Sequence, residues 1–238
     1  AARQALEAAE LAPGTPETLA ELRDPARRPQ QPHFPPDASN TSFRPDAPLA
    51  LDKKALLDNV RRARRGAAPG PSGTTAEHIR LLLDDEHCTD LFCEVAEDLA
   101  RAEIPEAAAE AIRLGRLTAL RKENGRVRGI VSGDLIRRLV ARTIAQQFGQ
   151  DFDEACRPFQ FALSTKAGTE CVAHAIRAST QLDVRTTVTS VDGVGAFDHV
   201  ARLPMLSSLR SLPRASAALP FVRLFYGRDS EYLWYDDE

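Results

Sequence analysis

The residues best suited to chemistry lie between positions 186 and 200, which read TTVTSVDGVGAFDHV. β-Branched Thr and Val residues predominate from 186 to 191, which predicts a short buried strand ending at Asp192. Gly193 and Gly195 follow, and glycine lets the backbone come close to a ligand. A carboxylate beside such glycines suits a divalent metal ion and a phosphate. A strand capped by an Asx-type turn is the alternative interpretation of the same residues.

Basic residues are concentrated in the middle of the chain, although the formal net charge is only -3. Positions 113–142 hold nine Lys and Arg residues against two carboxylates, and a second group occupies positions 61–65. Such clusters are typical of solvated helix faces, but they also favour phosphate binding through counterion release. The overall charge excludes a protein that coats nucleic acid indiscriminately.

The elements that must position these residues are predicted from periodicity and from turn signals. The segment Lys122-Glu123-Asn124-Gly125 joins two β-prone runs at 116–121 and 126–131, and Asn-Gly favours a hairpin. Further strands are expected at 186–191 and 231–235. Helices are expected at 3–11, 52–65, 75–83, 89–101, 105–112, 135–148, 167–181, 203–212 and 215–226, with Glu77 as the capping-box partner in the third. Strands interleave with helices without a regular βαβ series, which indicates the α+β class.

Composition divides the chain into two parts. Residues 1–50 hold nine of the sixteen prolines and are expected to be a largely disordered extension, whereas residues 51–238 carry the helical and strand patterns. No apolar run approaches the roughly 20 residues of a membrane helix. Four cysteines in 238 residues do not form a disulfide framework, which favours an intracellular protein, with nucleus or cytoplasm left open.

Other motifs are weaker. Residues 70–75 (GPSGTT) lack the lysine of a phosphate-binding P-loop, and no strand precedes them. His78, His87, Cys88 and Cys93 lie close together, but they do not have the spacing of a zinc site, and core cysteines are the simpler interpretation.

Six segments together resemble the reverse transcriptases of non-LTR (LINE-type) retrotransposons, in that family's order. They are residues 67–73 (AAPGPSG), 117–130 (LTALRKENGRVRGI), 135–144 (LIRRLVARTI), 159–162 (FQFA), 168–170 (GTE) and 191–198 (VDGVGAFD). The chain departs from the family pattern at Ser72, where Asp is usual, at Gly129, where Pro is usual, and at Arg142, where Lys is usual. The resemblance implies right-hand polymerase fingers and the first part of a palm, preceded by the proline-rich extension.

The resemblance also implies roles for particular residues. Asp192 and the carbonyl of Gly193 would bind Mg²⁺ in a two-metal site for nucleotidyl transfer. Lys122 and Arg128 would hold the triphosphate of a dNTP, and Phe197 would exclude a 2′-hydroxyl group. The residues expected to contact the RNA template and DNA primer are Arg137, Arg138, Arg142 and Gln160.

The final residues, from Trp234 to Glu238, superficially match the second aspartate motif of this family. The glutamine-containing turn that precedes that motif in the family is missing, so the pair Asp236-Asp237 is expected to be a hairpin tip instead. The chain is therefore expected to be an incomplete and inactive fragment of an RNA-directed DNA polymerase. A non-catalytic nucleic-acid-binding remnant and a helical interaction domain are the alternatives, and the oligomeric state is left open.

Overall fold

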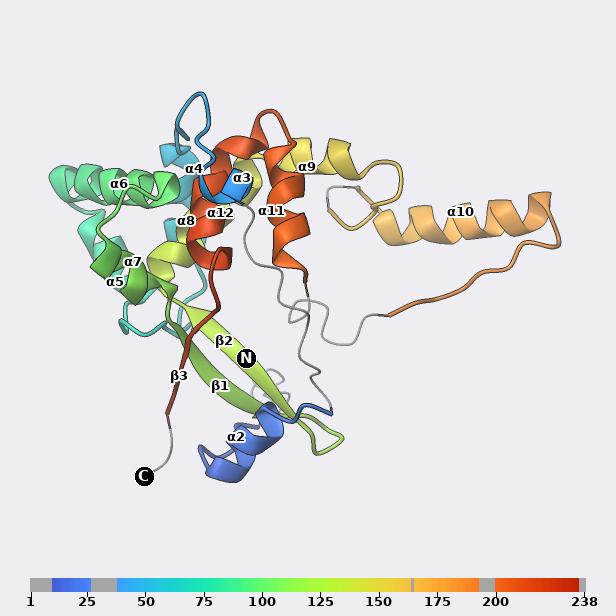
Figure 1. The fold of residues 1–238 in the computed structure, drawn as a ribbon, viewed down its shortest axis with the longest axis horizontal. Coiled ribbons are helices and arrows are strands. Elements are labelled where there is room, and N and C mark those ends of the chain that lie inside the picture. The colour runs from blue at the N-terminus through green and yellow to red at the C-terminus, as the bar shows by residue number, and fades with distance from the viewer. Residues whose placement is uncertain (1–9, 27–37, 164, 193–199, 236–238) are drawn as a thin grey trace.

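A small sheet and a larger group of helices make up the computed structural model, which describes residues 10–26, 38–163, 165–192 and 200–235 (Figure 1). The sheet has the strand order β2-β1-β3. Strands β1 (Gly115–Arg121) and β2 (Val127–Gly133) form an antiparallel hairpin, and β3 (Tyr232–Trp234) runs parallel to β1. The structure is therefore mixed helix and sheet.

Helices occupy most of the remaining described chain. In order they are α2 (Pro16–Leu22), α3 (Ala38–Thr41), α4 (Lys53–Arg62), α5 (Ala76–Leu82), α6 (Glu86–Arg101), α7 (Glu106–Arg113), α8 (Leu135–Gln147), α9 (Gly149–Cys156), α10 (Gly168–Leu182), α11 (Arg202–Arg210), the 3-10 turn η1 (Ala215–Ala218) and α12 (Leu219–Tyr226). Among the described residues, no helix has the length and apolar character needed to cross the bilayer.

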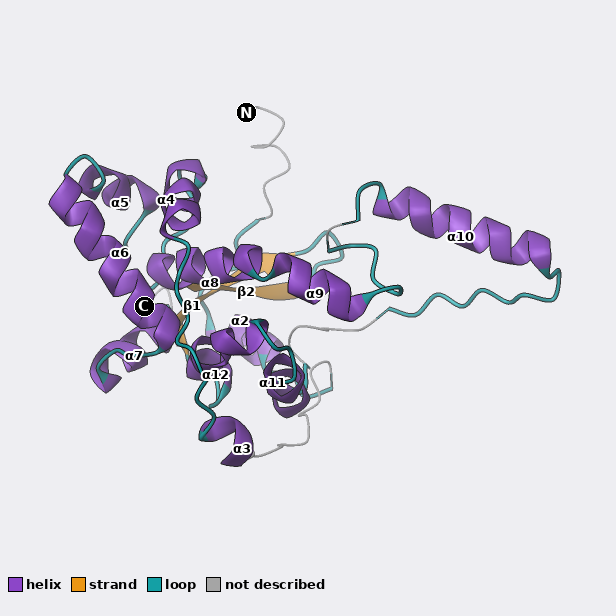
Figure 2. Ribbon diagram, turned by 90° about the horizontal axis from the view of Figure 1, so that it is seen from above, coloured by secondary structure: helices purple, strands orange, loops and turns teal. Residues whose placement is uncertain are grey.

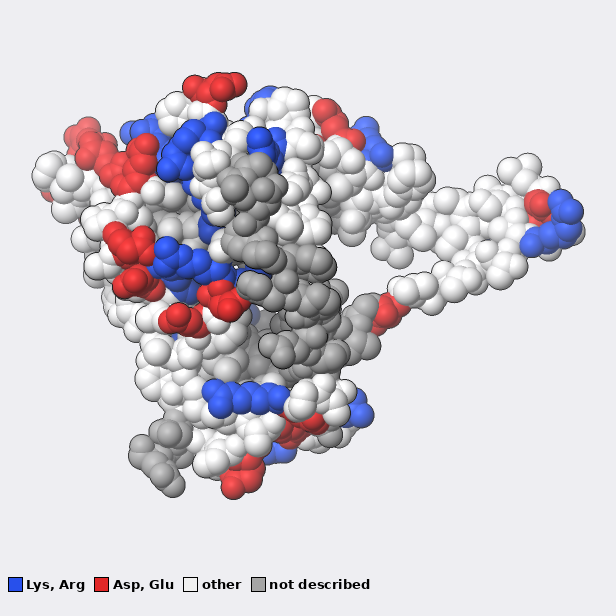
Figure 3. All heavy atoms as spheres, in the orientation of Figure 1, with Lys and Arg blue, Asp and Glu red and all other residues white. Residues whose placement is uncertain are grey.

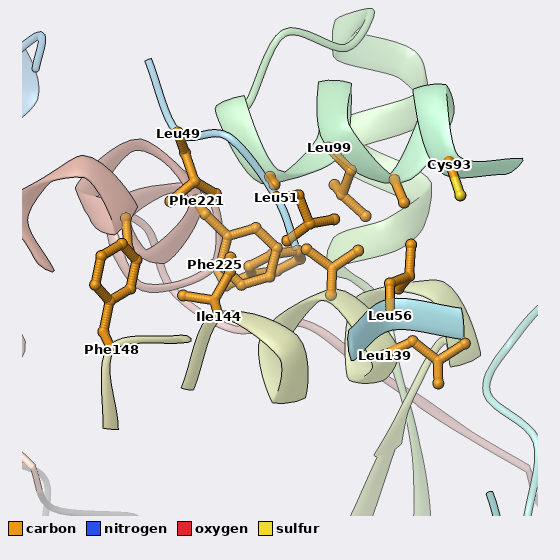
Figure 4. Close-up of a cluster of buried hydrophobic side chains, with 14 of the residues drawn as sticks. Leu49, Leu51, Leu56, Cys93, Leu99, Leu139, Ile144, Phe148, Phe221 and Phe225 are labelled. Atoms are coloured by element: carbon orange, nitrogen blue, oxygen red, sulfur yellow. The ribbon is translucent and has the colours of Figure 1, made fainter. Parts of the chain in front are cut away.

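The main core surrounds α8, which packs against α4 and α6 (Figure 4). Its most deeply buried side chains include Leu56, Leu99, Val140 and Leu219, and the helices that carry them are amphipathic. The polar side chain of Asn59 is also buried, and it donates hydrogen bonds to Thr143 Oγ1 (3.0 Å) and Gln146 Oε1 (2.9 Å). Because this amide is paired across α4 and α8, its burial is compatible with a stable core.

A second, smaller core lies between α2 and one face of the hairpin. Leu22 is buried there with Ala119 and Val127, and Glu21 Oε1 accepts a hydrogen bond from the Val127 amide at 3.0 Å. The prediction that residues 1–50 are largely disordered is wrong for this segment. Thr15 caps α2 and Pro16 occupies its first turn, so a short helix forms and buries an apolar residue.

Two short segments complete the edge of β1. Leu11 bridges Leu120, with the Ala12 amide donating to Ala119 O at 3.0 Å, while β3 pairs with the other end of the same strand at Gly115–Leu117. The strand edge that would otherwise present unpaired amides is thus covered along its length.

Most of the expected elements form within a few residues of their predicted bounds, but several differ. The expected strand at 186–191 is absent: these residues are exposed and have no regular secondary structure, because no described strand lies beside them to pair with. The capping-box partner in α5 is His78, whose Nδ1 accepts from the Thr75 amide (3.3 Å), instead of Glu77. Helix α9 was not predicted, and the expected helix 3–11 lies mostly outside the described residues.

Helix α10 projects away from the other elements in both views (Figures 1 and 2). None of its residues is buried, and its apolar side chains Val172 and Ile176 are exposed. The chain that follows α10 returns toward the body in extended form and reaches Asp192.

Candidate functional site

The turn of the hairpin is fixed by backbone hydrogen bonds around three central residues. Lys122 pairs with Arg126 (N to O, 2.8 Å), and the Gly125 amide donates to Lys122 O at 2.8 Å. Gly125 has φ +75°, the left-handed conformation that a three-residue hairpin loop requires, and Asn124 Oδ1 accepts from the Arg126 amide. The predicted Asn-Gly hairpin is confirmed.

Lys122 and Arg128 lie on the same face of this hairpin. Arg128 is the register partner of Leu120, and Lys122 stands two residues beyond Leu120, so the alternation of side chains places both on one side. Both side chains are exposed, whereas the opposite face is covered by α2. The hairpin therefore presents one face with exposed basic groups near its tip, which no other element of the described chain covers.

A third exposed basic residue, Arg126, belongs to this same face. It pairs with Lys122 across the turn, so its side chain follows the same alternation. It was not chosen as a site residue from the sequence, although it lies two residues before Arg128 in the expected strand, and residues two apart share a face. The surface formed by Lys122, Arg126 and Arg128 is called the hairpin basic face below.

The loop at 67–73 is fastened to the start of α8, directly after β2. The Ser72 amide donates to Asp134 Oδ2 at 3.2 Å, and Arg138 Nη2 donates to Ala68 O at 3.0 Å. Gly70 lies so close to the backbone of Gly133 and Asp134 that a Cβ atom would be 2.5 Å from Asp134 Cα. Two of the sequence segments singled out above are thus in direct contact.

The three arginines of α8 have different environments. Arg137 is partly buried: its guanidinium lies 4.1 Å from the centroid of the Phe225 ring, Nη1 donates to Arg113 O, and burial lowers its pKa. Arg138 is engaged with Ala68. Arg142 is exposed. The structure thus leaves Arg142 as the residue of the three best placed to contact an external ligand.

Within the described ranges, no contact joins the other predicted site residues to the hairpin basic face. Gln160 is exposed in the loop after α9, and its Oε1 accepts from the Ala162 amide at 2.7 Å. Asp192 is exposed at the end of the extended segment. Gly193 and Phe197 lie outside the described residues. No group of three or more His, Cys, Asp or Glu side chains within the described ranges converges on a point where a metal ion could bind.

Comparison with known proteins links the chain to retrotransposons. It is 23% identical over 190 residues to the retrotransposable element SLACS 132 kDa protein of Trypanosoma brucei gambiense, a match that covers 79% of this chain and 16% of that protein. It is 27% identical over 196 residues to the retrovirus-related Pol polyprotein from type-1 retrotransposable element R1 of Bradysia coprophila, covering 78% and 19%.

The chain spans less than a fifth of the length of these two curated relatives. No protein-family model matches it, and neither does any solved structure. The chain is therefore related to a region of retrotransposon proteins.

Proposed function

We propose that residues 51–238 are the fingers and the first part of the palm of a retrotransposon RNA-directed DNA polymerase. The observation that carries the proposal is the hairpin basic face, which presents exposed Lys122 and Arg128 together on the face opposite the one that α2 covers. The similarity to retrotransposon proteins over more than three quarters of the chain supports it.

On this proposal the hairpin basic face binds the triphosphate of an incoming dNTP. A guanidinium group donates two parallel hydrogen bonds to phosphate oxygens, and an ammonium group adds a mobile point charge. Arg128 therefore orients the triphosphate while Lys122 and Arg126 neutralise it. Arg142, and more weakly Gln160, would contact the template, whose backbone is recognised by charge and shape.

The metal chemistry of such an enzyme is not supplied by the residues described here. A two-metal site needs several carboxylates, and the described chain gathers no cluster of three potential ligands near Asp192. Asp192 is proposed as one Mg²⁺ ligand and Phe197 as the sugar-selecting residue on the resemblance alone.

Equilibrium binding of a fluorescent dNTP tests the role of the hairpin. Lys122→Gln and Arg128→Gln should each weaken binding about tenfold, the worth of one charge-assisted hydrogen bond. Arg121→Gln is the matched control, because Arg121 is the neighbour of Lys122 in the chain but its side chain lies on the other face of the hairpin. Equal losses in all three variants, or no loss in the first two, would refute the assignment.

A non-catalytic role in nucleic-acid binding is the second candidate, and the exposure of Arg142 favours it. RNA binding should then weaken steeply with salt, and Arg142→Gln should lower the slope of log K against log salt by about one. Binding of a dNTP separates the candidates: dNTP binding that Arg128→Gln weakens supports the polymerase region, and RNA binding without dNTP binding supports the alternative. Primer extension on an RNA template with Mg²⁺ tests the expected inactivity, and incorporation that Asp192→Ala abolishes would contradict it.

A further inference from the structure

A cavity of about 370 Å³ lies on the helical body, apart from the hairpin. Its walls come from residues 44–49, from the end of α6 and the two residues after it, and from η1 and α12, segments that are distant in the sequence. Arg44, Arg101 and Arg223 line it, together with Leu49, Pro220 and Glu103. Lys and Arg atoms gather in Figure 3 over the region where α3 and α12 lie in Figure 1.

Two of the three guanidinium groups are held in place by nearby backbone carbonyl oxygens. Arg223 Nη1 donates to Asn40 O (2.8 Å) and Phe43 O (3.1 Å), and Arg101 Nε donates to Leu49 O (2.9 Å). These bonds orient the side chains but leave further N–H groups on each guanidinium. The arginines are thus preorganised donors, which reduces the entropy lost when a ligand binds.

The positive charge around the cavity is only partly balanced. Arg101 forms an ion pair with Glu97 Oε1 at 2.7 Å, but within the described chain neither Arg44 nor Arg223 has a carboxylate within 4.0 Å. Burial lowers the pKa of Arg223, and the nearby charge of Arg44 lowers it further. Two cations that repel each other across a cavity would both be stabilised by an anion between them.

We propose that this cavity binds a phosphate group, with Arg44 and Arg223 as its principal ligands. Paired guanidinium groups match the oxygens of phosphate, and the apolar wall of Leu49 and Pro220 can contact an attached sugar or base. The volume lies within the range of small-ligand sites. The inference goes beyond the proposed polymerase function and does not require it, since no residue of the cavity belongs to the hairpin.

Isothermal titration of the full chain with inorganic phosphate at low salt tests the site directly. Arg44→Gln should weaken phosphate binding about tenfold. Arg44 is suited to this test because its side chain is exposed and, among the described residues, donates only to the neighbouring Phe43 carbonyl. Arg223→Lys keeps the charge but loses the planar fork, and it should also weaken binding. Arg177→Gln, an exposed arginine on α10, is the matched control, and circular dichroism checks that each variant folds.

The source of the phosphate is distinguished in a double variant, Lys122→Gln and Arg128→Gln, that lacks the proposed dNTP-binding residues of the hairpin. Into this variant dATP and a ten-nucleotide single-stranded RNA are titrated separately. Tighter binding of RNA identifies a nucleic-acid backbone, tighter binding of dATP identifies a nucleotide, and either supports the site if Arg44→Gln weakens it. An unchanged phosphate affinity in Arg44→Gln, an equal loss in Arg177→Gln, or binding of hexaglutamate but not of phosphate would overturn the proposal. Whether Lys122 and Arg128 bind a dNTP in the intact chain is a separate question, and its answer does not depend on these results.

Discussion

Replacing Gly70 by alanine should push the loop at 67–73 off the first turn of α8. The new Cβ atom would lie 2.5 Å from Asp134 Cα, 2.7 Å from Asp134 N and 2.7 Å from the carbonyl carbon of Gly133. All three are backbone atoms at the junction of β2 and α8, so they have no flexible side chain that could turn aside. The loop itself has to move.

The size of the effect follows from what that movement breaks. Overpacking of this kind costs about 1–3 kcal/mol. The displaced loop also weakens two hydrogen bonds, from the Ser72 amide to Asp134 and from Arg138 to Ala68 O, worth about 1 kcal/mol each. If the loop detaches completely, the overpacking disappears and only the lost bonds remain, so detachment limits the cost and we expect a loss of about 1–2 kcal/mol in the free energy of unfolding.

Urea unfolding followed by circular dichroism measures this loss, with two glycine controls. A Cβ at Gly149, the first residue of α9, meets no atom within 4 Å, and Gly149→Ala should leave stability unchanged or raise it by up to about 1 kcal/mol. Gly73 has equally open surroundings but φ +72°, so Gly73→Ala should cost about 1–2 kcal/mol through backbone strain alone. If Gly70→Ala unfolds at the same urea concentration as Gly149→Ala, the contact between loop and helix does not hold the loop in place.

Three further outcomes are expected. Leu22→Ala should cost about 2–3 kcal/mol and speed hydrogen exchange of the β2 amides, because it empties the small core between α2 and the hairpin. The hydrogen bond from Arg113 lowers the pKa of Glu106. This pair therefore stabilises the fold above the ordinary glutamate pKa and loses that effect as the pH falls through the lowered pKa. In Glu106→Gln, the urea concentration at the unfolding midpoint should fall less steeply as the pH is lowered. Cys93 is buried, and burial raises the pKa of its thiol, so a maleimide should label exposed Cys156 quickly and Cys93 only after unfolding.

Each of these outcomes has a result that contradicts it. Unchanged exchange at β2 in Leu22→Ala would mean that α2 does not protect the hairpin. If the urea midpoint of Glu106→Gln falls as steeply at low pH as that of the parent chain, the pair with Arg113 contributes nothing to acid stability. Equal labelling rates for Cys93 and Cys156 in the folded chain would place Cys93 outside the core.

Local patterns were sufficient to predict much of the structure. The apolar spacing of Leu56 and Val60 predicted α4, and the pair Asn124-Gly125 predicted the hairpin, because a helix face and a turn are both determined by residues close in the sequence. Helix α2 was missed although Thr15 and Pro16 give the usual start signals, since the surrounding prolines suggested a linker. Its stability comes from Leu22 packing on a hairpin about a hundred residues away.

The strand expected at 186–191 shows the limit of such reasoning. Its β-branched residues have the preference for extended backbone, and the chain there is indeed extended, but Val188 and Val191 are exposed. A strand also needs a neighbour to pair its amides, and no local pattern specifies that neighbour. The site has the same limit: Lys122 and Arg128 were expected to act together only from the family resemblance, and it is the observed strand register that places them on one face. The contacts that occupy Arg137 depend on Phe225 and Arg113, which no local pattern specifies.

The division of the structure into two separate cores determines how the proposed function can be studied. The main core around α8 and the small core under the hairpin share no buried residue. Lys122 and Arg128 lie on the face of the hairpin opposite the small core, so truncating them removes no buried contact from either core. A loss of dNTP binding in these variants at unchanged urea stability therefore reports on the ligand contact itself. A loss of both dNTP binding and urea stability would instead mean that the side chains of the hairpin basic face help to stabilise the fold.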